Sequence, residues 1–471
     1  MNTSDNHDLI VVGGGIAGIV TATRAAERGL RVAVLEKGET PDYKCNTRWS
    51  GGIVHVGYVD PKEPAANIEA GIARNTKGFT DPALADLLVK ETGKVIDWLR
   101  AQGIRFIRSG TLSYLAWTMA PPRALVAGMD WKGRGPDVML RTLTDQLIKR
   151  GGKLHLGVTA ARLIQDNGRV TGVEATDGRR FTGAAVVIAD GGFQANIDLI
   201  REKIMAHPEA VKQRGAATGM GDGMRMAVEA GASLTGLDTF YGHLLSRDSM
   251  TNDRVWPYPE LDGMATAGIV VNHAGQRFVN EGLGGVNMAN QIARNDDPLC
   301  ATLILDTPIW EGPGRSARIP ANPALERAGG TIFRAASLRE LAGLAKVDPD
   351  GLEATVAGYN AACASAAFDS LTPPRATDRF KPMPIEKGPF VAIPACAGIT
   401  YTMGGIRVDT DSRALAADGT PVPGLYAAGA ATGGIEGGPA IGYIGGLAKS
   451  ALLGFRAAEH AASAIGEGAK K

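Results

Sequence analysis

Gly13-Gly-Gly-Ile-Ala-Gly18 is a run of residues whose types and spacing could bind a pyrophosphate. Glycines at 13, 15 and 18 let the backbone turn tightly and approach the phosphates, and free amides at the start of a following helix would bind their charge. Glu36 lies 18 residues beyond Gly18, where a carboxylate at a strand end could accept hydrogen bonds from a ribose. An acid in that place disfavours a 2′-phosphate, so the pattern indicates NAD or FAD.

A βαβ unit is needed to position these residues, and the sequence predicts one. Residues 8–12 form a short apolar run, rich in β-branched side chains, that is typical of a buried parallel strand. Residues 16–28 have helical spacing and end at Gly29, a predicted C-cap, and residues 30–35 form a second strand that leads into Glu36. A glycine-rich turn without a ligand is the alternative, but the whole unit in register favours the dinucleotide site.

The rest of the chain changes character twice. Elements in the style of the first unit are predicted further along: helices from Thr80 and from Gly135, strands at 154–158, 184–189 and 424–428, and a last helix ending near Ile465. Between 236 and 384, prolines and tryptophans are frequent and strands do not alternate with helices. The predicted fold is therefore α/β, a discontinuous Rossmann-like dinucleotide-binding domain (1–235 and 385–471) with an inserted α+β capping or substrate domain (236–384).

Composition excludes several classes of protein. The 471 residues carry a formal net charge of +1, with 44% hydrophobic and 21% charged residues, which fits a globular chain of more than one domain without a basic surface for nucleic acid. The cysteines form no CxxC pair and the histidines no HExxH spacing, so neither disulfides nor a metal site are predicted. Without a signal-peptide pattern or an apolar run of roughly 20 residues, we expect a soluble, cytoplasmic protein with no membrane span.

Six motifs occur in an order that resembles one flavoprotein family. They are Gly13-Gly-Gly-Ile-Ala-Gly18 with Glu36-Lys37, Asn46-Thr-Arg-Trp-Ser-Gly-Gly52, Thr218-Gly-Met-Gly-Asp-Gly223, Arg277-Phe-Val-Asn-Glu281, Thr402-Met-Gly-Gly-Ile406 and Gly424-Leu-Tyr-Ala-Ala-Gly429. Over nearly the whole chain they resemble the FAD-dependent flavoproteins of fumarate reductase and succinate dehydrogenase, with the 3-ketosteroid Δ1-dehydrogenase and tricarballylate dehydrogenase branches. The tricarballylate branch looks nearest.

The resemblance implies FAD bound in an extended form. It places the pyrophosphate at Gly13, Gly15, Ala17 and Gly18, the adenosine at Glu36 and Val158, the flavin at Ser50, Gly51, Gly52, Gly446 and Leu447, and the ribitol at Asp222 and Gly429, with Ile16, Lys37, Trp49, Asp190, Gly191 and Ala430 beside them. A helix dipole at Gly446 would stabilise an anionic reduced flavin. Ala430 departs from the acid that the family often has. Non-covalent binding of FAD is expected. Some members attach flavin covalently through a His, and because Cys45 lies near that position, a covalent link through Cys45 stays open.

Tyrosines replace the cations that dicarboxylate reductases of this family use. Two histidines and an arginine hold the substrate in those enzymes, and of these only His243 is matched here. Tyr401 stands for the second histidine, Tyr443 for the arginine, and Gly284 or Gly285 for another arginine that delivers a proton. Burying a dicarboxylate without charge partners costs several kcal/mol per ion, which disfavours fumarate and succinate. Neutral hydroxyl donors indicate a ketone or a monocarboxylate instead.

The hypothesis that follows is α,β-dehydrogenation of a small carbonyl compound such as a cyclic ketone. His243, Tyr401 or the amides near 404–405 would hold the carbonyl and acidify the α C–H bond. Tyr443 or Tyr241 would take the α proton while flavin N5 takes the β hydride. The reverse reaction is ene-reduction, and the sequence does not fix the direction.

Three alternatives stay open. A tricarballylate-like carboxylate dehydrogenase, or an ene-reductase of the fumarate reductase type, could take its cations from Arg123 or Arg247. An electron-transfer subunit of a quinone-linked complex is disfavoured, because the chain has no cysteine cluster and no CxxCH motif. A flavin-binding protein without redox chemistry is the third. Oxygen, a quinone or a small carrier could accept the electrons, since no second GxGxxG unit for a nicotinamide is visible.

Overall fold

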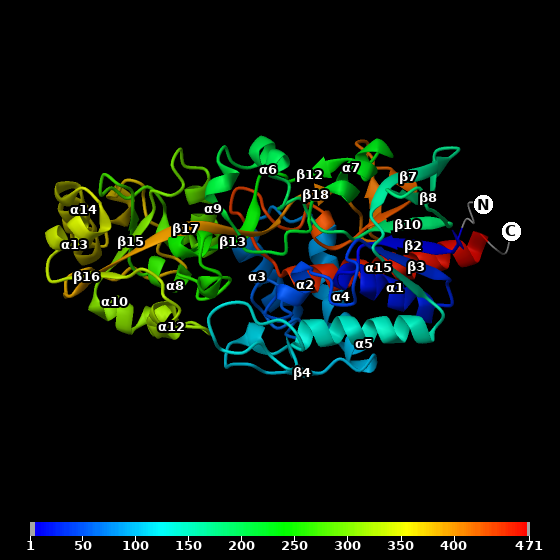
Figure 1. Ribbon diagram of the computed structural model, residues 1–471, viewed down its shortest axis with the longest axis horizontal. Coiled ribbons are helices and arrows are strands. Elements are labelled where there is room, and N and C mark those ends of the chain that lie inside the picture. The colour runs from blue at the N-terminus through cyan, green and yellow to red at the C-terminus, as the bar shows by residue number, and fades with distance from the viewer. Residues whose placement is uncertain (1–4, 469–471) are drawn as a thin grey trace.

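Two sheets organise the molecule, which is elongated and has one sheet toward each end (Figure 1). The structure is a computed structural model and describes residues 5–468. The first sheet has six strands in the order β19 (Arg413–Leu415), β20 (Pro421–Ala427), β10 (Ala185–Ile188), β2 (Leu9–Val12), β3 (Val32–Glu36) and β6 (Lys153–Leu156). All neighbours are parallel except β19 and β20. The predicted βαβ unit is β2, α1 (Ile16–Glu27) and β3.

Side chains of β2 alternate between two apolar cores, which explains its uninterrupted run of hydrophobic residues. Leu9 and Val11 pack with the helices on one face of the sheet, and Ile10 and Val12 pack against a four-stranded sheet on the other. That covering sheet has the order β1 (Asp5–Asn6), β9 (Arg180–Thr182), β8 (Arg169–Ala175) and β7 (Ala160–Asp166). The helix layer consists of α1, α3 (Ala65–Thr76), α4 (Pro82–Ala101), α5 (Gly135–Lys149) and α15 (Gly446–Gly468).

The second unit is built around one long strand, β17 (Phe390–Thr402). Its sheet has the order β11 (Lys212–Gln213), β17, β15 (Thr302–Leu305) and β14 (Ile269–Val271), and β13 (Phe240–Ser246) and β16 (Phe333–Ala335) also pair with β17. The helices of this region are α6 (Ile197–Lys203), α8 (Asp262–Ala265), α9 (Gly285–Ala293), α10 (Thr307–Glu311), α11 (Pro313–Ser316), α12 (Ala321–Arg327), α13 (Leu338–Ala345) and α14 (Pro349–Ser365). β17 runs from the far end of this unit toward the first one (Figure 1).

The remaining elements are short. They are α2 (Asn46–Trp49), α7 (Asp222–Glu229), β4 (Phe106–Ile107), β5 (Thr118–Met119), β12 (Leu234–Thr235), β18 (Gly405–Ile406) and the 3₁₀ helices Ser113–Leu115, Pro208–Ala210, Arg247–Met250, Asp253–Val255, Glu281–Leu283, Phe368–Ser370 and Gly429–Ala431. Among the helices of residues 5–468, none has the length and apolar character that crossing a membrane requires.

The second unit extends beyond the boundaries that the sequence predicts. β17 follows the predicted end at 384 but lies at the centre of the second sheet, and β11, before the predicted start at 236, pairs with it. Side chains from 193–211 and 391–399 share one apolar core with those between them. The prediction failed here because it rested on sequence style, and the order of strand pairing is set by contacts distant in the chain.

Candidate active site

The glycine turn after β2 leads into α1 as predicted. Gly13 has φ +105°, and a Cβ there would lie 2.5 Å from the carbonyl oxygen of Ala189, so only glycine fits. The amide of Gly14 donates to Glu36 Oε2 at 2.8 Å, which holds the carboxylate beside the turn. The structure gives Gly18 a packing role, because a Cβ there would meet the Gly13 oxygen at 1.9 Å.

A groove runs from this turn to the start of α15. Its first part is lined by the predicted residues Gly13, Gly15, Ile16, Ala17, Glu36, Lys37, Val158, Asp190, Gly191, Asp222, Gly429 and Ala430. Its second part is lined by Trp49, Ser50, Gly51, Gly52, Gly446 and Leu447. Both parts share Ile16, Asn46, Thr47, Ala430 and Ser450, so the groove is continuous. Gly18 is the one predicted cofactor residue that lies outside both walls.

Polar atoms along the groove fit a dinucleotide. Trp49 Nε1, Asp190 Oδ1 and Gln194 Oε1 are buried without a hydrogen-bond partner, although each side chain lines the groove. Burial raises the pKa of Asp190 to about 6. Groups left in this state inside a protein are costly unless a ligand completes their hydrogen bonds. An extended FAD, with its flavin toward the amides of Gly446, meets these requirements.

Cys45 lines the first part of the groove, with Glu36 and the glycine turn. The second part, with Ser50 and Gly51, is not lined by it. Burial raises the pKa of its thiol to about 11, which removes the thiolate that a covalent attachment would need. These observations favour non-covalent FAD.

The four predicted catalytic side chains meet in the second part of the groove. Tyr241 and His243 come from β13, and Tyr401 from the paired position on β17. The ring of Tyr443, from the loop before α15, stacks on Tyr241 with a centroid distance of 4.0 Å. Burial raises the pKa of Tyr241, Tyr401 and Tyr443 well above the ordinary value. Their hydroxyls are therefore neutral donors.

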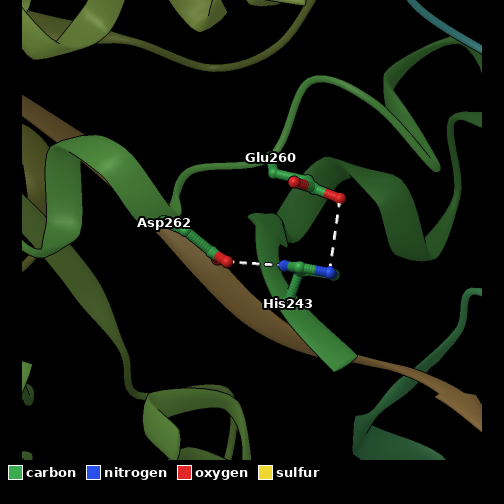
Figure 2. Close-up of side chains that lie close together, drawn as sticks. All are labelled: His243, Glu260 and Asp262. Atoms are coloured by element: carbon green, nitrogen blue, oxygen red, sulfur yellow. Dashed lines mark hydrogen bonds and ion pairs between the residues drawn. The ribbon is translucent and has the colours of Figure 1, made fainter. Parts of the chain in front are cut away.

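His243 bridges a tyrosine and a carboxylate. Its Nε2 lies 2.8 Å from the hydroxyl of Tyr241. Its Nδ1 lies 2.5 Å from Asp262 Oδ2 (Figure 2). The amide of Leu244 donates to the other Asp262 oxygen at 2.8 Å. Both ring nitrogens of His243 are thus engaged, and the expectation that it holds the substrate carbonyl directly gives way to a role behind Tyr241.

Glu260 completes the surroundings of His243, at 3.5 Å from its Nε2 (Figure 2). The ligand atoms of His243, Glu260 and Asp262 lie within 4.8 Å of one another, close enough for a metal ion. Arg214, however, donates to Glu260, and Asp262 accepts from His243 and a backbone amide. Both carboxylates are thus satisfied within the protein, and Asp262 orients the imidazole.

Tyr401 is fixed by a buried ion pair. Its hydroxyl donates to Glu436 Oε2 at 2.9 Å, and Lys449 from α15 lies 2.7 Å from the same oxygen. Burial alone would raise the pKa of Glu436, but Lys449 and the amides of Ile444 and Gly445 outweigh it and hold that pKa below the ordinary value. Since the Tyr401 hydrogen points at Glu436, the predicted donation from Tyr401 to a substrate carbonyl is not supported. Gly404 and Gly405, also expected near that carbonyl, are not among the residues that line the cavity.

Packing leaves no room for an arginine at 284 or 285, where the resemblance places the arginine that delivers a proton. A Cβ on Gly284 would meet the Phe380 ring at 2.7 Å, and one on Gly285 would lie 1.8 Å from Asp262 Oδ2. A side chain at 285 and the contact between Asp262 and His243 therefore exclude each other. The glycines leave a second cavity, lined also by Arg379, on the other side of Tyr58, His243 and Tyr443.

Several residues of the site were not predicted. His55, Tyr58 and Tyr114 extend the tyrosine cluster, and Asp262, Glu260 and Glu436 support it. Tyr58 stands at φ 61°, a conformation unusual for tyrosine and favoured here by its ring contacts with His55 and Tyr443. Only their position near glycine-rich loops could have indicated them. Of the two arginines considered for a carboxylate, Arg123 lines the cavity and Arg247 does not.

Comparison with known proteins agrees with this geometry. The model of the FAD binding domain family matches residues 8–442. The chain belongs to this family. It is 26% identical over 480 residues to the fumarate reductase (cytochrome) of Shewanella frigidimarina, covering 96% of this chain and 76% of that protein. It is 27% identical over 526 residues to the 4-oxocyclohexanecarboxylate 2-dehydrogenase of Sinomonas cyclohexanicum, covering 93% and 89%.

Its fold is that of solved members. The 3-ketosteroid delta1-dehydrogenase from Sterolibacterium denitrificans, solved with 1,4-androstadiene-3,17-dione, superposes with a TM-score of 0.75 at 21% identity, covering 98% of this chain and 100% of that one. The predicted family, α/β fold with a capping unit, enzyme class and FAD cofactor are thereby confirmed. The protein is an FAD-dependent oxidoreductase of the fumarate reductase and dehydrogenase family that acts on carbon–carbon bonds.

Proposed function

We propose that this enzyme introduces a double bond next to the carbonyl of a small substrate such as a cyclic ketone. The observation that carries the proposal is the chain of contacts from Tyr241 through His243 to Asp262. Dehydrogenation of a ketone requires a base that takes the α proton. These contacts give Tyr241 an acceptor, His243, for its hydroxyl proton, and Tyr241 can therefore serve as that base.

The state of Tyr241 decides how the proton moves. Burial raises its pKa well above the ordinary value, so a free phenolate is not available. A neutral His243 that donates Nδ1–H to Asp262 keeps Nε2 as an acceptor. As the Tyr241 oxygen takes the α proton, its own proton passes to Nε2, and Asp262 stabilises the imidazolium that results.

Tyr443 supplies the donor to the carbonyl in this proposal. Its oxygen accepts from the amide of Gly446 at 3.2 Å, which leaves its hydrogen for the substrate. Because it stacks on Tyr241, donor and proton acceptor stand side by side. A hydrogen bond to the carbonyl is strongest when negative charge develops on the enolate oxygen, and it therefore lowers the barrier.

The residues of the groove would hold the FAD that the reaction needs as hydride acceptor. The chemistry that bound FAD supplies is acceptance of a hydride from the β carbon, so that the substrate loses one proton and one hydride and gains one double bond. The names of two relatives, 4-oxocyclohexanecarboxylate 2-dehydrogenase and 3-ketosteroid delta1-dehydrogenase, describe dehydrogenation of oxo compounds and support this assignment.

A second candidate is a carboxylate dehydrogenase or ene-reductase of the fumarate reductase type. Arg123 and Arg214 line the cavity and favour it, because cations are what a carboxylate substrate needs. Arg214, however, is already paired with Glu260.

Anaerobic mixing distinguishes the two candidates. The purified flavoprotein is mixed with cyclohexanone, 4-oxocyclohexanecarboxylate, a 3-ketosteroid, tricarballylate or succinate, and the oxidised flavin absorbance is followed. Bleaching by an oxo compound but not by succinate supports the ketone dehydrogenase. Bleaching by tricarballylate or succinate alone would overturn it in favour of the second candidate.

A further inference from the structure

Four cationic side chains line the substrate cavity, and two of them lack a counter-charge. Arg214 and Lys449 each pair with a carboxylate, as described above. Arg123 and Arg318 also line the cavity but form no ion pair within residues 5–468. The cavity is thus lined by two guanidinium groups that have no ion-pair partner among the described residues.

Arg123 is the more deeply buried of the two, with 5% of its surface exposed. Its Nη2 donates to the carbonyl of Gly128, its Nε has no hydrogen-bond partner, and its guanidinium lies 4.7 Å from the centre of the Tyr258 ring. Burial lowers its pKa, because the charge is removed from water and nearby groups offset this only in part. An anion placed beside this guanidinium would reduce the cost of its burial.

Arg318 approaches the same cavity from the second unit, between α11 and α12. Its Nη1 lies 3.9 Å from the position that a Cβ on Gly51 would occupy, and the hydroxyl of Tyr258 lies 3.7 Å from that position. Burial is the main cause that lowers the pKa of Arg123; Tyr258 and Asp130 raise it in part, and the positive charges of Arg214 and Arg318 lower it. The two guanidinium groups line the same cavity with the same charge, so an anion bound there has two cations to pair with.

We propose that the substrate is an oxo acid, whose carboxylate is bound by Arg123 and Arg318 while its carbonyl faces Tyr443. This inference rests on the proposed dehydrogenation. The pyrophosphate of FAD is not the anion in question, because the glycine turn that binds it lines the other part of the groove. The planar fork of arginine matches a carboxylate, and a carboxylate held from both units would also fix the cap over the flavin.

Binding of two matched compounds tests the proposal. The oxo acid of the panel above and its methyl ester are titrated into the oxidised holoenzyme, and dissociation constants are read from the change in flavin absorbance. Loss of a charged hydrogen bond costs roughly 10- to 100-fold in affinity, so the acid should bind at least about tenfold more tightly than the ester. Arg318→Gln should weaken the acid by a similar factor and leave the ester within about twofold.

Arg315→Gln is the control, since Arg315 is exposed, pairs with Glu311 in the same segment and does not line the cavity. Equal affinity of acid and ester in the unmodified enzyme, or equal weakening of both by Arg318→Gln, would overturn the inference. Arg123→Lys keeps the charge and should retain part of the preference for the acid. If the acid binds but neither compound bleaches the flavin, the proposed dehydrogenation is contradicted while the carboxylate site is not.

Discussion

The carboxylate of Asp262 lies 2.5 Å from Nδ1 of His243, on the side of the imidazole opposite Tyr241. Asp262 is the first residue of α8 and His243 lies within β13, so two elements of the second unit hold the pair. The amide of Leu244 fixes the remaining oxygen of Asp262. Since both nitrogens of His243 are bound, the imidazole has one orientation, and Tyr241 always faces an acceptor.

Tyr241→Phe should lower kcat by about 10²-fold or more, because it removes the atom that receives the α proton. His243→Gln should cost a similar factor, and the double variant should be little worse than either single one, since the two residues act as a unit. Steady-state kinetics with the best oxo substrate measures this. Tyr426→Phe is the matched control, because its hydroxyl contacts His460 outside the cavity at 2.9 Å. Multiplicative losses in the double variant would show that the two residues act independently.

Gly285→Ala should impair catalysis although Gly285 has no chemical group to contribute. The new Cβ would lie 1.8 Å from Asp262 Oδ2, so the carboxylate must leave His243. We expect kcat to fall roughly tenfold or more with a smaller change in KM, as for loss of the residue that orients a catalytic imidazole.

Gly358→Ala in α14 is the control for this substitution, since no atom lies within 4 Å of the position of its Cβ. That variant should be as active as the unmodified enzyme and no less stable. Full activity of Gly285→Ala would contradict the role given to Asp262.

The part of the cofactor groove that the first βαβ unit forms could be predicted from the sequence, because its residues are local. Gly13, Ile16 and Glu36 lie within one βαβ unit, where spacing alone determines geometry. His243 and Tyr401 could be placed by motif, and pairing of β13 with β17 brings their strands together.

The supports of the site could not be predicted in this way. Asp262 and Glu436 act through contacts across 19 and 35 residues, and a single carboxylate in a loop has no periodic signal. The extent of β17 was missed for a different reason, the presence of a proline within it. Pro394 reads as a strand breaker, yet it lies within β17 opposite Thr302 of β15.

Glu436→Gln should destabilise the fold, because it leaves Lys449 as an unpaired buried charge. Both side chains have at most 1% of their surface exposed. Breaking such a pair costs about 3–5 kcal/mol, and the free energy of unfolding from urea titration measures it. Replacing both residues, as Glu436→Gln with Lys449→Met, should restore part of the loss. Lys90→Met, which removes an exposed pair with Asp86, should change little, and an equally small effect of Glu436→Gln would contradict the prediction.

His55 should make stability depend on pH between 7 and 5.5. Burial lowers its pKa from 6.5 to about 4, so in this range the unfolded chain binds a proton that the folded chain does not. Stability therefore rises with pH here, and the contribution of His55, present above pH 6.5, is lost as pH falls toward 4. From that shift we expect the free energy of unfolding to drop by about 1 kcal/mol from pH 7 to pH 5.5.

The comparison variant is His55→Gln, which cannot titrate. Its stability at pH 7 will be lower, because the Tyr58 amide loses its acceptor at Nδ1. Its change between pH 7 and pH 5.5 should nevertheless be smaller by about 1 kcal/mol than that of the unmodified holoenzyme. His273→Gln, which removes an exposed histidine, should leave the slope as it is. If His55→Gln keeps the full pH dependence, the protonation that destabilises the fold occurs at another group, and the tyrosine cluster tolerates a charged His55.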